Sequence, residues 1–273
     1  MRVVLCCIAK KEHKYINDFV KWYIDIGVDT IYIYDNDDKD SEHIEYYIDT
    51  QYRKKVIIYN VRGETGKNLQ NKCYQHFYNT QMQKFNWCLF CDIDEFLVGV
   101  KDIKAFLSQP QFFQVPQIRI KWKLFGDDNL IERDMSKPVY ECFHKEITKA
   151  YSRDLKREKR LYDQGKFILR GGLKGAVFNS VHYASYISRN CPFRSVLPSG
   201  ARCDSVVEIK EDYSKEKVFL NHYMTKSLSE FIEQKLGRND AVFNINLPLD
   251  YYWRINEKTE EKLKYLREKH LIN

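Results

Sequence analysis

The sequence is poor in the residues that mark flexible linkers, with 6 prolines and 11 glycines among 273 residues. This scarcity argues against long disordered connections, and a composition of 44% hydrophobic and 30% charged residues indicates a globular chain with a substantial core. No apolar run is long enough to cross a bilayer. The first eleven residues lack the apolar core and cleavage site of a secretory signal, so a cytoplasmic protein is expected.

The 8 cysteines do not suggest a disulfide framework, because the chain is long and shows no export signal. Cys88 and Cys91 have the spacing of a redox or zinc pair, but they lie in an apolar run and no second pair follows. We interpret them as small buried hydrophobic residues.

The net charge of +7 is moderate, and its densest basic cluster covers residues 153–160. A solvated surface is the favoured interpretation of that cluster, with attraction to an anionic substrate or a membrane surface as the alternative. No nucleic-acid-binding motif accompanies the charge, so no nucleic-acid partner is expected.

Strand-like and helical segments alternate over the first hundred residues, which predicts an α/β fold with a mostly parallel sheet. After residue 100 the alternation is less clear, although Ser227 and Glu230 form a capping box at the start of a helix. The predicted strands are residues 2–9, 30–34, 56–61, 87–91, 115–123, 167–183 (interrupted by glycines) and 218–223, and the predicted helices are 15–26, 41–52, 68–83, one from 227 and one over 259–271.

The most informative stretch runs from Trp87 to Leu97, where an apolar strand-like segment meets three carboxylates. Buried carboxylates are costly unless they are paired, hydrogen-bonded or bound to a cation. Asp92 and Asp94 are two residues apart, so on an extended chain they point to the same side. Two such oxygens suit a divalent cation that carries a substrate phosphate. The alternative is a structural carboxylate pair, because the same spacing occurs elsewhere in polar, turn-like segments.

Polar residues follow the carboxyl ends of three predicted strands, at positions 10–12, 35–36 and 92–94. Open α/β sheets bind their ligands beyond the carboxyl ends of the strands. The three positions together therefore favour a ligand site at this edge of the sheet.

With this order of elements, the chain resembles the family-2-like and family 92 glycosyltransferases, which have the GT-A fold. The resemblance extends over about residues 5 to 240, with departures at Lys11, where asparagine is common, and in the turn at 126–129. Its motifs are Cys7-Ile8-Ala9-Lys10-x-Glu12 with Trp22 and Gly27, Ile31-Tyr32-Ile33-Tyr34-Asp35-Asn36, Asp92-Ile93-Asp94-Glu95-Phe96-Leu97 after Trp87, His222-Tyr223-x-Thr225-Lys226-Ser227-x-x-Glu230-Phe231, and more weakly Trp122-x-x-Phe125-Gly126.

The resemblance implies a GT-A-type, Rossmann-like, mostly parallel sheet flanked by helices, in a single domain with acceptor-side additions. Residues 1–100 would form the nucleotide-sugar-binding half, 101–240 the acceptor-binding and metal-completing half, and 241–273 a C-terminal helical tail. The implied activity is metal-dependent transfer of a sugar from a nucleotide-sugar, with a UDP-sugar as the expected donor, to a hydroxyl of a glycan or lipid-linked acceptor. Mn²⁺ or Mg²⁺ is the implied cofactor, and peripheral association with the inner membrane face is a further expectation.

The resemblance also implies roles for individual residues. Asp94 is the expected direct metal ligand, Asp92 binds the metal or the ribose, and His222 completes the metal shell, with His182 as its rival. The residues expected to bind the donor are Ala9, Lys10, Glu12, Asp35, Asn36, Asp92, Lys226 and Ser227.

An inverting transfer needs a carboxylate that takes the acceptor proton. Asp127, Asp128 and Glu208 are the candidates, and Asp128 is preferred, with a turn-forming aspartate as its alternative role. Two other functions remain open: a metal-dependent nucleotidyltransferase, which usually has a glycine-rich phosphate loop after the first strand, and a non-catalytic sugar- or nucleic-acid-binding protein.

Overall fold

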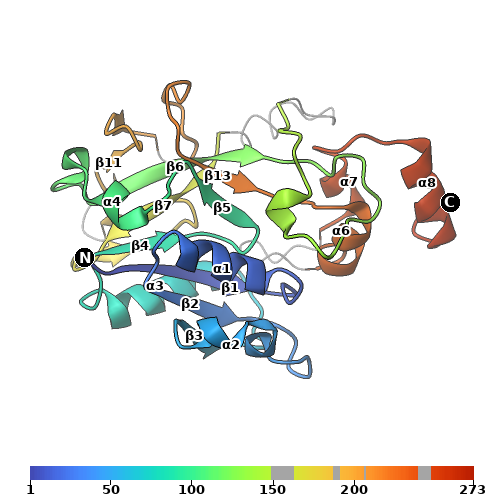
Figure 1. The fold of residues 1–273 in the computed structure, drawn as a ribbon, viewed down its shortest axis with the longest axis horizontal. Coiled ribbons are helices and arrows are strands. Elements are labelled where there is room, and N and C mark those ends of the chain that lie inside the picture. Colours follow the sequence, from blue (N-terminus) through green and yellow to red (C-terminus); the bar gives the residue numbers. More distant parts are fainter. Residues whose placement is uncertain (149–162, 187–190, 206, 239–246) are drawn as a thin grey trace.

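The computed structural model describes residues 1–148, 163–186, 191–205, 207–238 and 247–273 (Figure 1). The predicted basic cluster at 153–160 lies outside these residues. The first part of the chain alternates strands and helices as predicted. Its main elements are β1 (Val3–Ala9), α1 (Ile16–Asp25), β2 (Thr30–Asp35), β3 (Val56–Asn60), α3 (Leu69–Gln81) and β4 (Trp87–Phe90).

One predicted helix, over residues 41–52, is wrong. The structure has a 3-10 turn, η1 (Ile44–Tyr47), and a short helix, α2 (Thr50–Arg53). The buried guanidinium of Arg62 lies 3.4 Å from the Asp35 carboxylate and donates hydrogen bonds to several backbone carbonyls of the preceding loop. These carbonyls turn toward one cation, so the loop cannot use them to build a helix.

The central sheet has the strand order β12-β11-β6-β7-β4-β1-β2-β3 (Figure 1). β1, β2, β3 and β4 run parallel, and β7 (Gly165–Arg170) lies antiparallel between β4 and β6 (Gln117–Leu124). β13 (Phe219–His222) is parallel to β6 and antiparallel to β5 (Glu95–Val98), which follows β4 in sequence. The prediction of a mostly parallel, Rossmann-like sheet flanked by helices in one domain is confirmed, and its assignment to the GT-A type stays a prediction.

The remaining elements are short and lie mostly in the second half of the chain. Among the described residues, no helix combines the length and the apolar character that crossing a bilayer requires. The short elements not yet named are α4 (Ile103–Leu107), η2 (Pro110–Phe112), η3 (Val139–Glu141), β8 (Ala176–Val177), β9 (Ser185–Tyr186), β10 (Cys191–Pro192), β11 (Ser195–Val196), β12 (Arg202–Cys203), α6 (Leu228–Gln234), α7 (Leu249–Tyr252) and α8 (Glu260–Glu268).

Two apolar cores cover the two faces of the sheet, as the alternation of side chains along a strand requires. In β1, Leu5 and Cys7 belong to the core that contains the buried face of α1. Val4 and Cys6 belong to the other core, with the buried face of α3. The central strands are therefore buried on both faces, which leaves their carboxyl ends as the place for polar residues.

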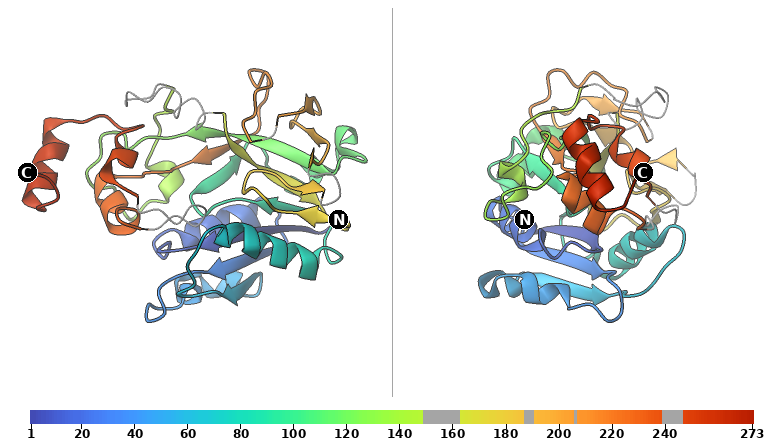
Figure 2. Two further views of the ribbon diagram at one scale, coloured as in Figure 1. Left: turned by 180° about the vertical axis from the view of Figure 1, so that it is seen from behind. Right: turned by 90° about the vertical axis from the view of Figure 1, so that its right-hand side faces the viewer.

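The helices α6, α7 and α8 gather at one end of the sheet (Figure 2). An apolar cluster that includes Leu228, Tyr252 and Leu266 joins them. A buried ion pair fastens them to the turn after β6, because Lys262 Nζ lies 2.5 Å from Asp127 Oδ2. The Tyr252 hydroxyl donates a hydrogen bond to the same carboxylate oxygen.

Replacing Lys262 by methionine should lower the free energy of unfolding by about 3–5 kcal/mol, because Asp127 would stay buried without its cation. Chemical denaturation measures the change. Lys264→Met, at an exposed position of the same helix, is the control and should cost no more than about 0.5 kcal/mol. The double variant Asp127→Asn, Lys262→Met should recover part of the loss. Equal effects of Lys262→Met and Lys264→Met would contradict a stabilising buried pair.

Candidate functional site

The end of β13 lies beside the segment that joins β4 to β5. His222 pairs with Glu95 in the β13–β5 ladder, and the Tyr223 N–H donates a hydrogen bond of 2.9 Å to the Asp94 carbonyl. The chain then enters α6 at Ser227. Lys226 and Lys235, which flank the two ends of α6, both lie within 4 Å of the Asp94 carboxylate. The predicted site residues Asp94, His222 and Lys226 are thus brought together.

The segment from Asp92 to Glu95 is a turn. The Glu95 N–H donates a hydrogen bond of 3.1 Å to the Asp92 carbonyl, and β4 already ends at Phe90. The two aspartates are therefore not on an extended strand, and the premise that they point to the same side is wrong. The Asp92 carboxylate accepts hydrogen bonds from Gln70 Nε2 at 2.5 Å and Lys166 Nζ at 2.8 Å, whereas Asp94 faces β13 and α6.

The Asp94 side chain is 7% exposed and has three positively charged or ionisable neighbours. Lys235 Nζ lies 2.6 Å from Asp94 Oδ2 and also donates to the Met224 carbonyl. Lys226 Nζ lies 3.8 Å from the same oxygen, and His222 Nε2 lies 3.4 Å from Oδ1. Burial opposes ionisation of Asp94, but Lys235, His222 and Lys226 hold its pKa well below the usual value.

Asp94 Oδ1 and His222 Nε2 are suitably spaced to share a cation. Two neighbouring ligands of an octahedral ion, each at about 2.1 Å, lie roughly 3 Å apart, and the observed separation is 3.4 Å. In the described part of the chain no group of three or more His, Cys, Asp or Glu side chains could hold a metal. An ion on this pair would need further ligands, such as water or substrate oxygens.

His182, the rival of His222, packs against the same Trp122 ring. The ring centroid of Trp122 is 4.5 Å from that of His222 and 5.5 Å from that of His182. His182 Nδ1 is 2.9 Å from the Gly165 carbonyl oxygen, and burial, aided by Lys166, lowers the pKa of His182 to about 3. The structure thus places His222, and not His182, against Asp94.

Lys226 carries a buried ammonium group that has no hydrogen-bond partner among the described residues. Its Nζ lies 3.6 Å from Glu12 Oε2 and 4.1 Å from the centroid of the Tyr15 ring. Burial lowers the pKa of Lys226, while Glu12 and Asp94 oppose that change. A buried cation without a hydrogen bond is costly, so this position is suited to receive an anion.

Other residues that were expected to bind the donor form the loop framework at the ends of β1 and β2. Asn36 donates its backbone N–H to the Ala9 carbonyl at 2.8 Å, and its side-chain amide donates to two carbonyls of the next loop. Asp35 is paired with Arg62, and Lys10 Nζ lies 3.9 Å from an Asp38 carboxylate oxygen. Their contact with a donor stays a prediction.

Ser227 begins α6 through the predicted capping box, which is confirmed. Its hydroxyl donates to Glu230 Oε2 at 2.6 Å. Glu230 also accepts hydrogen bonds from the Tyr15 hydroxyl and from Arg133 Nε, each at 2.6 Å. The Ser227 side chain is therefore committed to the helix start, and its role in donor binding stays a prediction.

The candidate acceptor bases have other partners. Asp127 is held by Lys262 and Tyr252, and Asp128 accepts two hydrogen bonds from backbone N–H groups, at 2.8 and 3.1 Å. Asp128 has φ +50°, which matches its alternative role as a turn-forming residue. Glu208 lies 3.9 Å from Lys210 Nζ. These contacts favour anchoring roles for Asp127 and Asp128, and the assignment of a base stays a prediction.

Sequence reasoning missed Lys166, Lys235 and Arg238. Arg238 Nη1 donates to the Lys10 carbonyl at 2.7 Å and lies 3.7 Å from Glu12 Oε1. The position of Lys166 next to the apolar run of β7 indicated that this lysine has a buried ionic partner. The three-residue spacing of Lys235 and Arg238 indicated, more weakly, that their side chains lie on the same side of the chain.

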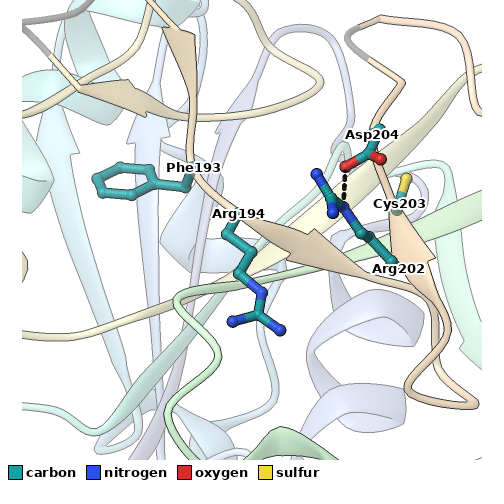
Figure 3. Close-up of a pocket in the computed structure, with 5 residues that line it drawn as sticks. All are labelled: Phe193, Arg194, Arg202, Cys203 and Asp204. Carbon is teal, nitrogen blue, oxygen red and sulfur yellow. Dashed lines mark hydrogen bonds and ion pairs between the residues drawn. The ribbon is translucent and has the colours of Figure 1, made fainter.

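A cavity of about 550 Å³ lies in another part of the molecule, next to β11 and β12 (Figure 3). Figure 1 shows β11 at the opposite end of the molecule from α6. In the cavity wall Arg202 Nε is 2.5 Å from Asp204 Oδ1. The cavity is lined by Phe193, Arg194, Arg202, Cys203 and Asp204. None of these is a predicted site residue.

No protein-family model matches the chain, and a search of curated proteins finds no match. Among solved structures, the chain is similar to the crystal structure of TarS from S. aureus, with a TM-score of 0.35 and 16% sequence identity. The match covers 62% of this chain and 28% of the TarS chain.

Asp94→Asn is expected to destabilise the fold near pH 7, because Lys235 would remain buried beside an uncharged amide. The pKa of Asp94 is lowered by folding, so its charge stabilises the fold at pH values above the unfolded pKa of about 3.9. The stability difference from wild type should be constant between about pH 7 and pH 5 and shrink as the pH falls below about 4.

Chemical denaturation across this pH range measures the difference. Asp204→Asn, which removes an exposed partner of Arg202, is the control and should change stability by less than about 1 kcal/mol. A difference between Asp94→Asn and wild type that grows on acidification would contradict the assigned pKa direction.

Proposed function

We propose that the chain is a metal-dependent glycosyltransferase that moves a sugar from a nucleotide-sugar, a UDP-sugar, to a hydroxyl of a glycan or lipid-linked acceptor. The observation that carries the proposal is the buried Lys226 ammonium, which has no hydrogen-bond partner in the described parts of the chain, beside the Asp94–His222 pair. It lies at the edge of the sheet where α/β folds bind their ligands. An anion and a cation could be bound side by side there, as a donor diphosphate and its metal require.

Asp94 and His222 would hold the Mn²⁺ or Mg²⁺ ion. When bound, such an ion offsets the negative charge of the diphosphate and so makes it a better leaving group. Lys226 would donate a charge-assisted hydrogen bond to the diphosphate. Asp92, with 32% of its side chain exposed and its carboxylate oriented by Lys166, would face the donor ribose. The motifs shared with family-2-like and family 92 glycosyltransferases support these finer assignments.

The residues at the ends of β1 and β2 would surround the nucleoside. Asp35 and Asn36 hold the loop after β2 in one conformation, and Ala9 is bonded to Asn36 across the two strand ends. A rigid loop of this kind suits a ligand group that must be placed accurately, because little entropy is lost on binding.

A screen of nucleotide-sugars tests the proposal. The wild-type chain should slowly hydrolyse one of them in the presence of Mn²⁺, and EDTA should abolish the reaction. Release of pyrophosphate from a nucleoside triphosphate would favour the nucleotidyltransferase alternative. Sugar or nucleotide binding that EDTA does not change, without any turnover, would favour the non-catalytic alternative.

His222→Ala should weaken Mn²⁺-dependent binding of UDP by about tenfold or more, corresponding to about 1.5–3 kcal/mol for a lost interaction with a charged group. Calorimetry with and without Mn²⁺ measures the change. His182→Ala is the matched control, because His182 packs against the same tryptophan ring, and it should weaken binding much less. A larger effect of His182→Ala would reverse the assignment of the metal-binding histidine.

A further inference from the structure

Five buried or largely buried charged side chains, including Asp94 itself, lie close together at this site. They are the carboxylates Glu12 and Asp94 and the cations Lys226, Lys235 and Arg238, none of which has more than 16% of its side chain exposed. Among the described residues, this group has one more basic side chain than carboxylates, and burial already lowers the pKa of Lys226. An excess of positive charge is costly in a buried place unless an anion is bound there.

The neighbouring ion pairs do not supply the missing negative charge. Lys166 is matched by Asp92 at 2.8 Å, and Arg133 is matched by Glu230 at 2.6 Å. Glu95 lies 3.9 Å from Lys166 Nζ, on the side of Asp92, and burial raises the pKa of Glu95 well above the usual value. Among the described residues, the extra basic side chain therefore belongs to the group of five.

Hydrogen bonds in this group are also left unmade. Lys226 Nζ and Glu12 Oε2 are both buried without a hydrogen-bond partner in the described part of the chain, and they lie 3.6 Å apart. Arg238 Nη1 is 3.7 Å from Glu12 Oε1, which is likewise beyond hydrogen-bond length. Lys226 and Arg238 thus flank one carboxylate without bonding to it, and Arg238 Nη1 donates instead to the Lys10 carbonyl at 2.7 Å.

Lys235 differs from these two cations because it is fully engaged. Its ammonium group bonds to Asp94 Oδ2 and to the Met224 carbonyl. This contact fixes the orientation of the Asp94 carboxylate and leaves Oδ1 facing His222. Lys235 is therefore a positioning residue, whereas Lys226 Nζ has no hydrogen-bond partner among the described residues and Arg238 is the most exposed of the three cations, at 16%.

We propose that Lys226 and Arg238 form a binding site for a diphosphate that works without a divalent cation. The inference rests on the proposed function, in which this diphosphate belongs to the nucleotide-sugar. An ammonium and a guanidinium on two sides of a diphosphate can donate several charge-assisted hydrogen bonds. The bound anion would neutralise the excess charge, and a metal would add to an affinity that the chain already has.

Calorimetry with inorganic pyrophosphate in the presence of EDTA tests this site on the full chain. Wild-type protein should bind pyrophosphate more tightly than inorganic phosphate. Arg238→Met and Lys226→Met should each weaken pyrophosphate binding by about tenfold or more. Lys14→Met is the matched control, because Lys14 is an exposed lysine that pairs with Glu233 on α6, and it should leave the Kd unchanged. If Lys226→Met fails to fold, the more exposed Arg238→Met decides the question.

The inference is overturned if pyrophosphate does not bind in EDTA or if Arg238→Met binds it as tightly as wild type. Donor hydrolysis together with pyrophosphate binding that appears only after Mn²⁺ is added would overturn this inference and leave the proposed function standing. Arg238-dependent pyrophosphate binding in a chain that hydrolyses no nucleotide-sugar would support this inference and contradict the proposed function.

Discussion

The buried carboxylate of Asp94 requires positive charge around it, and this requirement links distant parts of the chain. Lys235 lies just beyond the end of α6, Lys226 comes just before its start, and His222 ends β13. An unpaired buried charge costs several kcal/mol, so these contacts hold β13 and α6 against the turn after β4. The packing of the C-terminal half and the geometry of the site depend on the same group of charges.

The same charges would determine what the site can bind. Because Asp92 has its own cation in Lys166, the two aspartates of the motif serve separate places, one partly exposed and one buried. Glu230 joins α6 to α1 through the Tyr15 hydroxyl and thereby fixes the backbone next to Lys226. Charges held rigidly before a ligand arrives need little reorganisation when it binds, which is the general advantage of a preorganised polar site.

Sequence patterns predicted the elements with a clear apolar periodicity or cap, such as β1, α1, α3 and the capping box at Ser227. Carboxylates after an apolar strand pointed to Asp94, and the family resemblance pointed to His222. The structure places these two side chains against each other, and their role in binding stays a prediction. The sequence patterns failed at two loops after strands. Arg62 binds the carbonyls of Ser41 and Glu42, at the start of the predicted helix. The local turn at Asp92 removes the strand alternation that the motif suggested.

The basic partners of Asp94 and Asp127 were equally out of reach, because Lys235 and Lys262 lie more than a hundred residues away from them in the chain. A crystal structure with UDP and Mn²⁺ tests the central claim most directly. The account predicts an ion bonded to Asp94 Oδ1 and His222 Nε2 at about 2.0–2.3 Å, with the diphosphate on Lys226. An ion held by Asp92 and His182, or a diphosphate bound away from Lys226, would contradict it.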